Sequence, residues 1–160
     1  MKTIFWAVIV LLIIFGLVAF VNRDGGSTSQ VAEDDNAMTG QKDSIKNIAG
    51  VRTASLVAVD GSSSSGVGYI VRVDGKLMHL VEAEMPEPAD GNSYEGWLVD
   101  TSASPLKFFS TGIISKNASG TWILEYETDQ EYPGYDRVVI TEETIMDETP
   151  ERHVIEGDFK

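Results

Sequence analysis

The sequence predicts an all-β domain, an antiparallel β-sandwich of about eight strands, preceded by one N-terminal transmembrane helix. Three observations support this prediction. An unbroken apolar run lies near the N-terminus, short β-branched and aromatic runs alternate with turn residues from residue 51 onward, and no later segment has the 3.6-residue period of an amphipathic helix. The chain then divides into a cytoplasmic stub at 1–3, a transmembrane helix at 4–21, a flexible linker at 22–50 and an extracytoplasmic domain at 51–160.

The apolar run extends from Ile4 to Val21 without a charged residue. A helix of this length spans about 27 Å, which is enough to cross the hydrocarbon core of a bilayer. A cleaved signal peptide is the alternative, but its apolar part is usually about 7–15 residues long and ends in a small-x-small cleavage site. The bulky side chains of Phe20 and Val21 occupy that place here. We therefore expect a retained anchor, which makes the protein an integral, single-pass membrane protein.

The charges on either side of the apolar run predict its orientation. Lys2 and the α-amino group precede it, whereas Arg23 is followed at once by Asp24 and then by a long acidic chain. Basic residues favour the cytoplasmic side of a membrane helix. We expect a cytoplasmic N-terminus and an extracytoplasmic domain.

Composition excludes several classes of function. The chain has 12 basic and 25 acidic residues, and all basic residues except Lys2 follow the apolar run, so the remainder carries a net charge of −14. Such a surface repels nucleic acid, and no nucleic-acid partner is expected. The absence of cysteine excludes disulfides, thiolate nucleophiles, thiolate zinc sites and a lipid-modified cysteine.

The linker at 22–50 is poor in aromatic residues and rich in Gly, Ser, Asp and Asn. Beyond it, turn residues separate the β-type runs, and the Asp74-Gly75 pair is the strongest hairpin signal. The expected strands are Ala54 to Val59, Val67 to Val73, Leu77 to Met85, Tyr94 to Val99, Lys107 to Ile114, Thr121 to Tyr126, Arg137 to Thr141 and His153 to Phe159.

Alternation within two strands predicts which aromatic residues share a face. One strand places Trp97 and Val99 together, and another places Trp122, Leu124 and Tyr126 together. Large aromatic side chains in such stripes more often fill a core than form a ligand platform, because of the area that they bury. We expect both sets to be buried.

No metal or cofactor site is expected from the two histidines. A site built on His79 or His153 needs further ligands such as Glu82 or Glu156, and the spacing brings no third ligand close. The run from Ser62 to Ser65 lacks the Gly-Lys-Ser/Thr ending of a phosphate-binding loop.

Carboxylates give no catalytic set either. Acidic pairs arise by chance in so acidic a chain, and no cluster matches the Asp-x-Asp-x-Asp-Gly calcium loop, although weak calcium binding stays open. No Gly-x-Ser-x-Gly elbow occurs. The clusters are Asp129 to Glu131, Glu142-Glu143 and Asp147-Glu148.

The C-terminal half contains, in order, VEAEMPEPADGNSYEGWLVD, FFSTGIIS, YDRVVITEE and HVIEGDF. This order resembles the C-terminal extracytoplasmic domain of bacterial anti-sigma-K factors. The resemblance implies a β-rich domain in a bacterial cell envelope and a structural role for the matching residues. They are Pro86, Gly91, Tyr94, Trp97, Leu98, Gly112, Tyr135, Asp136, Thr141 and Glu143.

Two features depart from that family. Thr144 to Pro150 replaces its Gly-rich loop, and only Met1 to Thr3 precede the apolar run, so we expect no cytoplasmic sigma-binding domain. The sequence thus favours a non-enzymatic, membrane-anchored extracytoplasmic module that binds a protein partner or senses the envelope. An envelope hydrolase using paired carboxylates among Glu82, Glu84 and Glu95, or a structural spacer or adhesion module, are the alternatives.

Overall fold

The computed structural model describes residue 45 and residues 47–160, which belong to one compact unit, Asp43–Lys160. Its regular elements are nine strands: β1 (Arg52–Ala58), β2 (Ser65–Val73), β3 (Lys76–Glu84), β4 (Ser93–Asp100), β5 (Lys107–Ile113), β6 (Ser115–Lys116), β7 (Trp122–Thr128), β8 (Arg137–Glu143) and β9 (Arg152–Asp158). The predicted stub, the membrane segment and most of the linker lie outside the described residues. Within the part that is described, no helix has the length and apolar character needed to span a membrane.

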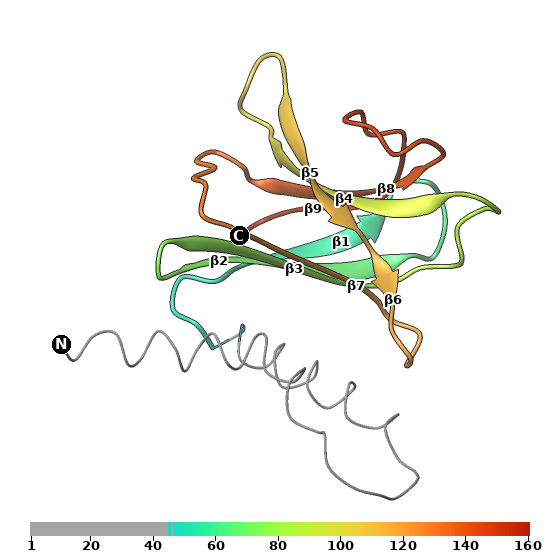
Figure 1. Ribbon diagram of the computed structural model, residues 1–160, viewed down its shortest axis with the longest axis horizontal. Helices are drawn as coiled ribbons and strands as arrows, with labels where there is room; N and C mark the ends of the chain where they lie inside the picture. Colours follow the sequence, from blue (N-terminus) through green and yellow to red (C-terminus); the bar gives the residue numbers. More distant parts are fainter. Residues whose placement is uncertain (1–44, 46) are drawn as a thin grey trace, which may run out of the picture. The chain divides into compact units, whose positions relative to one another are not determined.

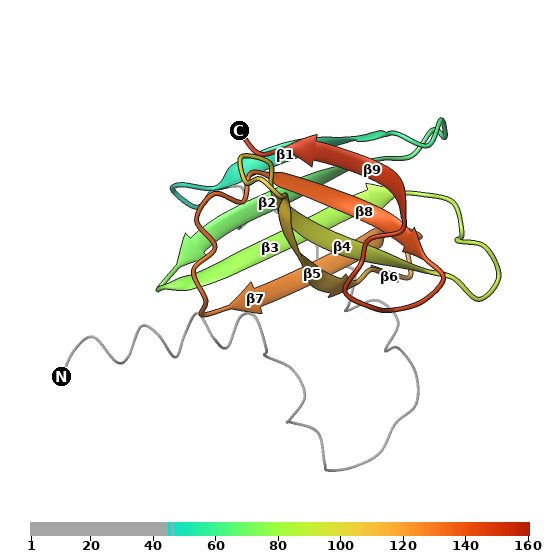
Figure 2. The same cartoon turned by 90° about the horizontal axis from the view of Figure 1, so that it is seen from above.

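All nine strands belong to one antiparallel sheet in the order β5-β4-β8-β9-β1-β2-β3-β7-β6. The sheet curls over, so that β5, β4, β8 and β9 form one layer and β1, β2, β3 and β7 form the facing layer (Figure 1). Seen from above, β9, β8, β4 and β5 lie next to one another (Figure 2). The predicted antiparallel all-β class is confirmed. The layers differ from the two separate sheets of a sandwich, because they are parts of one nearly closed, barrel-like sheet.

One side of the barrel is closed by a bent strand. β5 pairs with β4, and after Ile114 the same chain continues as β6, which pairs with β7 in the other layer. Gly112 has a φ of 105°, a conformation that side-chain-bearing residues rarely adopt, and the β4–β5 register shifts beside it between Gly96 and Trp97. The Ile114 amide donates to the Tyr94 carbonyl at 3.0 Å. This bulge turns the strand from one layer into the other.

The opposite side is closed by β1 and β9, which pair through Val57 with Glu156 and Ala58 with Ile155. The two backbones approach so closely at Gly157 that a β-carbon there would lie 2.2 Å from the Ser55 carbonyl oxygen. Only glycine fits at this point. The seam between the layers therefore depends on the absence of a side chain at residue 157.

The eight strands that the sequence predicts are all present, with ends shifted by a few residues, and β6 is the additional ninth. The Asp74-Gly75 hairpin is confirmed: Val73 pairs with Lys76, and the two turn residues have φ values of 50° and 84°. Positive φ at both central residues is the signature of the type I′ turn that Asp-Gly favours.

The barrel interior is packed with apolar side chains from every long strand. Trp122 and Leu124 lie there as predicted, with Tyr126 partly buried against them. The Trp122 ring meets the Tyr94 ring edge to face at 5.1 Å, and its indole N–H donates to the Met85 carbonyl at 2.9 Å.

His79 also points into the interior, between Ile70 of β2 and Tyr126 of β7. It is fully buried, and its ring lies 6.0 Å from that of Phe159. In the part of the chain that the structure describes, neither ring nitrogen has a hydrogen-bond partner. Because burial disfavours the charged ring, the pKa of His79 falls to about 3. His79 is thus a neutral core residue.

Candidate functional site

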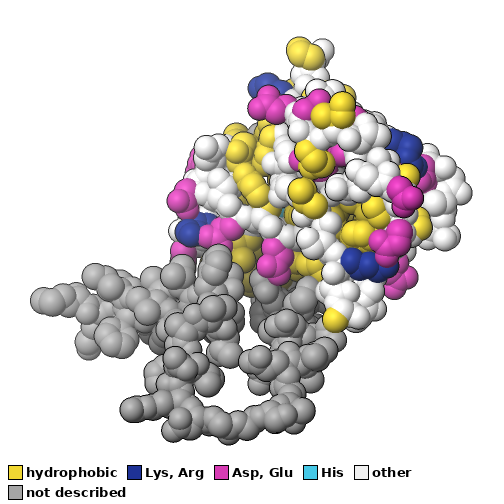
Figure 3. Space-filling view, turned by 45° about the vertical axis from the view of Figure 1, so that its right-hand side comes forward, with side chains coloured by type: hydrophobic (Ala, Val, Ile, Leu, Met, Phe, Trp, Pro, Cys, Tyr) yellow, Lys and Arg dark blue, Asp and Glu magenta, His cyan; other side chains and the backbone are white. Residues whose placement is uncertain are grey.

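An apolar groove lies on the outer face of β5, β4, β8 and β9 and encloses about 270 Å³. Its apolar lining comes from Trp97, Val99, Leu106, Phe108, Val139 and Pro150. Leu106, in the β4–β5 connection, and Phe108, on β5, remain 58% and 40% exposed beside this apolar lining. Apolar side chains also reach the surface at the projecting β4–β5 connection (Figure 3). We call this surface the outer groove.

Trp97 belongs to the groove and yet is only 1% exposed. Its ring meets Phe108 edge to face at 5.9 Å, and its indole N–H donates to the Thr141 hydroxyl at 2.8 Å. The predicted burial of Trp97 is confirmed. The barrel core, however, receives its neighbours Tyr94 and Leu98, because alternation sends Trp97 to the outer face.

Charged side chains form one rim of the groove. Arg137 on β8 pairs with Glu156 at 3.3 Å and with Asp158 at 2.7 Å, both on β9. His153 Nδ1 lies 3.1 Å from the second oxygen of Glu156. The rim cation is therefore already shared between two carboxylates, and within the described part of the chain Glu156 is the one carboxylate that lines the groove.

Two buried carboxyl groups lie on the same outer face, beyond Thr141. Glu95 on β4 accepts a hydrogen bond from the Ser110 hydroxyl, and Glu143 on β8 accepts the Glu151 amide at 3.1 Å. Each keeps a second oxygen that is buried and has no hydrogen-bond partner among the described residues. They are diagonal neighbours, since Ser93 pairs with Glu143 and Glu95 with Thr141. Burial raises the pKa of Glu95 despite the Ser110 bond, and the nearby charges of Glu143 and Asp147 raise it further.

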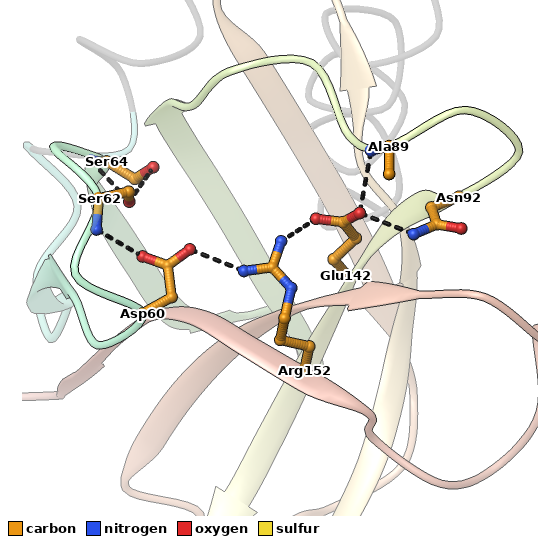
Figure 4. Close-up of polar contacts among 7 residues, drawn as sticks. All are labelled: Asp60, Ser62, Ser64, Ala89, Asn92, Glu142 and Arg152. Atoms are coloured by element: carbon orange, nitrogen blue, oxygen red, sulfur yellow. Dashed lines mark hydrogen bonds and ion pairs between the residues drawn. The ribbon is translucent and has the colours of Figure 1, made fainter.

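A different carboxylate, Glu142, joins the loops at one end of the barrel (Figure 4). It accepts the Ala89 amide at 2.9 Å and the Asn92 side-chain amide at 2.7 Å, and it pairs with Arg152. Arg152 also pairs with Asp60 at 2.9 Å. Burial alone would raise the pKa of Glu142, but these three donors outweigh it and hold the pKa below its usual value. The network ties the β1–β2 and β3–β4 loops to β8 and β9.

Glu95 and Glu142 should therefore affect stability with opposite pH dependence. The folded domain holds a proton on Glu95 more readily than the unfolded chain, so this residue weakens the fold as pH rises above about 4.5. Glu142 strengthens the fold above that pH, and its contribution is lost on acidification. Urea denaturation at pH 7 should show Glu95→Gln to be more stable than wild type and Glu142→Gln less stable. The first difference should shrink as the pH falls to about 4.5, and the second should shrink only below about 4.5. A shift of the same sign in both variants would contradict this assignment.

The motif residues from the sequence fall into separate groups. Trp97 and Thr141 are hydrogen-bonded, and Glu143 follows Thr141 on the same face. Tyr94 and Leu98 point into the core. The others lie elsewhere: Pro86 and Gly91 are in the β3–β4 connection, Gly112 is at the bulge, and Tyr135 and Asp136 precede β8.

The two residues before β8 help to fix the β4–β5 connection. Both carboxylate oxygens of Asp136 accept bonds from Thr101, from its amide at 3.0 Å and its hydroxyl at 2.7 Å. These bonds lower the pKa of Asp136. Tyr135 meets the Phe109 ring edge to face at 5.0 Å.

Sequence reasoning missed Leu106, Phe108, Val139 and Arg137 as parts of a surface site. One signal was present. Phe108 and Phe109 are consecutive residues of a strand, and alternation must send them to opposite faces. Phe109 packs inside against Tyr132, so Phe108 has to lie outside.

A second hollow of about 360 Å³ opens beside Gly50, Arg52, Arg72 and Tyr135. It is more polar than the outer groove, and the Arg72 guanidinium in it already donates to the Gly75 and Gln130 carbonyls. Across the described residues, no three His, Asp or Glu side chains come together as metal ligands. His79 lies inside the barrel, whereas His153 lies at the rim of the outer groove.

No protein-family profile, curated protein or solved structure matches the chain.

Proposed function

We propose that the domain is a non-enzymatic binding or sensing module that receives a protein partner in the outer groove. The observation that carries this proposal is the exposure of Leu106 and Phe108 beside the apolar lining of the groove. Burying such side chains in a complex is favourable at about 25 cal/mol per Å² of apolar area. Aromatic residues are also enriched at protein interfaces.

The charged groups of the outer groove agree better with binding than with hydrolysis. A carboxylate-based hydrolase needs two acidic residues facing one cleft, with pKa values pushed apart. Among the described residues, Glu156 is the only carboxylate in the groove lining, and Glu95 is buried outside that lining. The resemblance to the outer domains of anti-sigma-K factors also favours a regulatory or sensing role over catalysis.

We further propose that the apolar run from Ile4 to Val21 anchors the domain in the cell membrane, with the N-terminus in the cytoplasm. The length of the run and the position of Lys2 support this proposal. The bacterial cell envelope, implied by the resemblance, is then the place where the partner is met.

The orientation makes a direct prediction for cells stripped to the inner membrane. Added protease should digest the chain beyond Arg23 and leave the membrane segment behind, because the domain lies outside. The remaining fragment can be detected with a tag at the N-terminus after lysis. Full-length protein surviving in intact spheroplasts, but cleaved once they are lysed, would reverse the proposed orientation.

Partner binding through the outer groove can be tested by crosslinking at single positions in native membranes. A photoreactive residue at position 106 should form discrete crosslinked species, since Leu106 is exposed at the groove. The same residue at position 84 is the control, because Glu84 is exposed at the end of β3 in the facing layer. Phe108→Ser should reduce the crosslinks from position 106, and Ile113→Ser, on the same strand outside the groove lining, should not. No discrete species at position 106, or the same species at position 84, would refute groove binding.

A further inference from the structure

The strand that forms one wall of the outer groove is also an end of the sheet. β5 is first in the strand order and pairs with β4 from Lys107 to Gly112 and Ile113. Among the described strands none pairs with its other edge, because the chain crosses to β7 only after the bulge, as β6. The beginning of β5 and the β4–β5 connection rise away from β7 (Figure 1). An edge strand of this kind presents backbone N–H and C=O groups that can pair with another chain.

The free edge and the groove are continuous. Phe108 projects from β5 over Trp97, and Leu106 lies just before the strand. A strand added to β5 would lie about 4.8 Å away, with every second side chain on the outer face. Those side chains would extend the apolar surface formed by Leu106 and Phe108. Main-chain pairing would then supply affinity and the groove would supply selectivity, as in other cases of strand addition.

The charge near the outer groove favours a basic partner segment over a second copy of this chain. The loop after β8, which brings Pro150 to the groove, carries Asp147, Glu148 and Glu151 on the surface and contains no Lys or Arg. The rim cation Arg137 is already shared between Glu156 and Asp158. A second copy would bring its own net charge of −14 from the remainder of the chain against this surface. A segment with Lys or Arg at the positions that do not enter the groove is complementary to it.

We infer that the outer groove receives an extended segment of a partner protein, which pairs with the free edge of β5. In this segment, apolar residues are interspersed with Lys or Arg. This inference rests on the proposed function and names the partner's chemistry. The partner segment adds one strand beside β5, and its apolar side chains contact Leu106 and Phe108.

The test begins with a random library of displayed 12-residue peptides, selected on the full chain in nanodiscs and counter-selected on empty nanodiscs. The inference expects enriched peptides with β-branched or aromatic residues and a net positive charge. These peptides should lose about tenfold or more in affinity for Phe108→Asp and should keep their affinity for the control Ile113→Asp. Enrichment of acidic peptides, or no enrichment over empty nanodiscs, would overturn it.

Strand pairing is tested by methylating backbone nitrogens of one enriched peptide. In a paired strand, alternate N–H groups face the neighbouring strand, so methylating one alternate set should weaken binding about tenfold or more, and methylating the other set should not. Equal effects of the two sets would overturn strand addition while leaving groove binding, and hence the proposed function, intact. The absence of discrete crosslinked species at position 106 of the wild-type chain in native membranes would refute the proposed function itself.

Discussion

Acidifying the domain from pH 7 to pH 4 should lower its free energy of unfolding by about 3 kcal/mol through His79 alone. The ring has an ordinary pKa of 6.5, and burial lowers the pKa to about 3 in the folded domain. Between pH 6.5 and 3, the unfolded chain therefore binds a proton on this ring that the folded domain does not bind. The contribution of His79 to the free energy of unfolding is complete above pH 6.5 and is lost as the pH falls from 6.5 toward 3.

Urea denaturation of residues 43–160 across this pH range measures the effect. His79→Leu should remove most of the His79 contribution to the pH dependence, and at neutral pH it should also remove the penalty of two unpartnered ring nitrogens. His153→Leu is the matched control, because His153 lies exposed at the surface beside Glu156. If the His79→Leu domain kept the same pH dependence as wild type and the His153→Leu control, the assignment of His79 as a buried neutral residue would be wrong.

Replacing Trp97 by Ala should cost about 3–5 kcal/mol, a large part of the about 5–15 kcal/mol that stabilises a small domain. The substitution removes a buried ring from beneath Phe108 and leaves the Thr141 hydroxyl without its indole donor. The denaturation midpoint of residues 43–160 should fall markedly.

Two further variants separate the causes. Trp97→Phe keeps most of the buried area and loses the hydrogen bond, so it should cost only part of the alanine effect. Val57→Ala alters an apolar side chain that is 60% exposed and should change the midpoint little. An unchanged midpoint in Trp97→Ala would mean that Trp97 is open to solvent and free to contact a ligand.

Most of the strands could be predicted because alternation and turn chemistry are local properties. The Asp74-Gly75 turn fixes its hairpin from two residues. β6 was missed because it has only two residues and follows a bulge, which leaves no period to detect. The joining of the layers depends on Gly157, where two segments distant in sequence meet, and nothing local reports that meeting.

The outer groove was harder to predict than the strands. Alternation separates Trp97 from Leu98, but it does not say which of the two enters the barrel. Both faces of β4 are covered, one by the core and one by Phe108 and its neighbours. The sequence of β4 therefore has apolar residues on both faces. Trp97 and Thr141 are among the residues that match the outer domains of anti-sigma-K factors. In the structure, the Trp97 indole N–H donates a hydrogen bond to the Thr141 hydroxyl.

The pairing of β1 with β9 also sets an order of events during synthesis. Val57 and Glu156 are neighbours in the sheet although roughly a hundred residues separate them along the chain. β1 and β2 leave the ribosome early, yet one edge of β1 stays uncovered until β9 has been made. A nascent chain at that stage presents an open strand edge, which is prone to pair with other chains. The last strand to emerge is therefore the one that completes the barrel and ends this period of exposure.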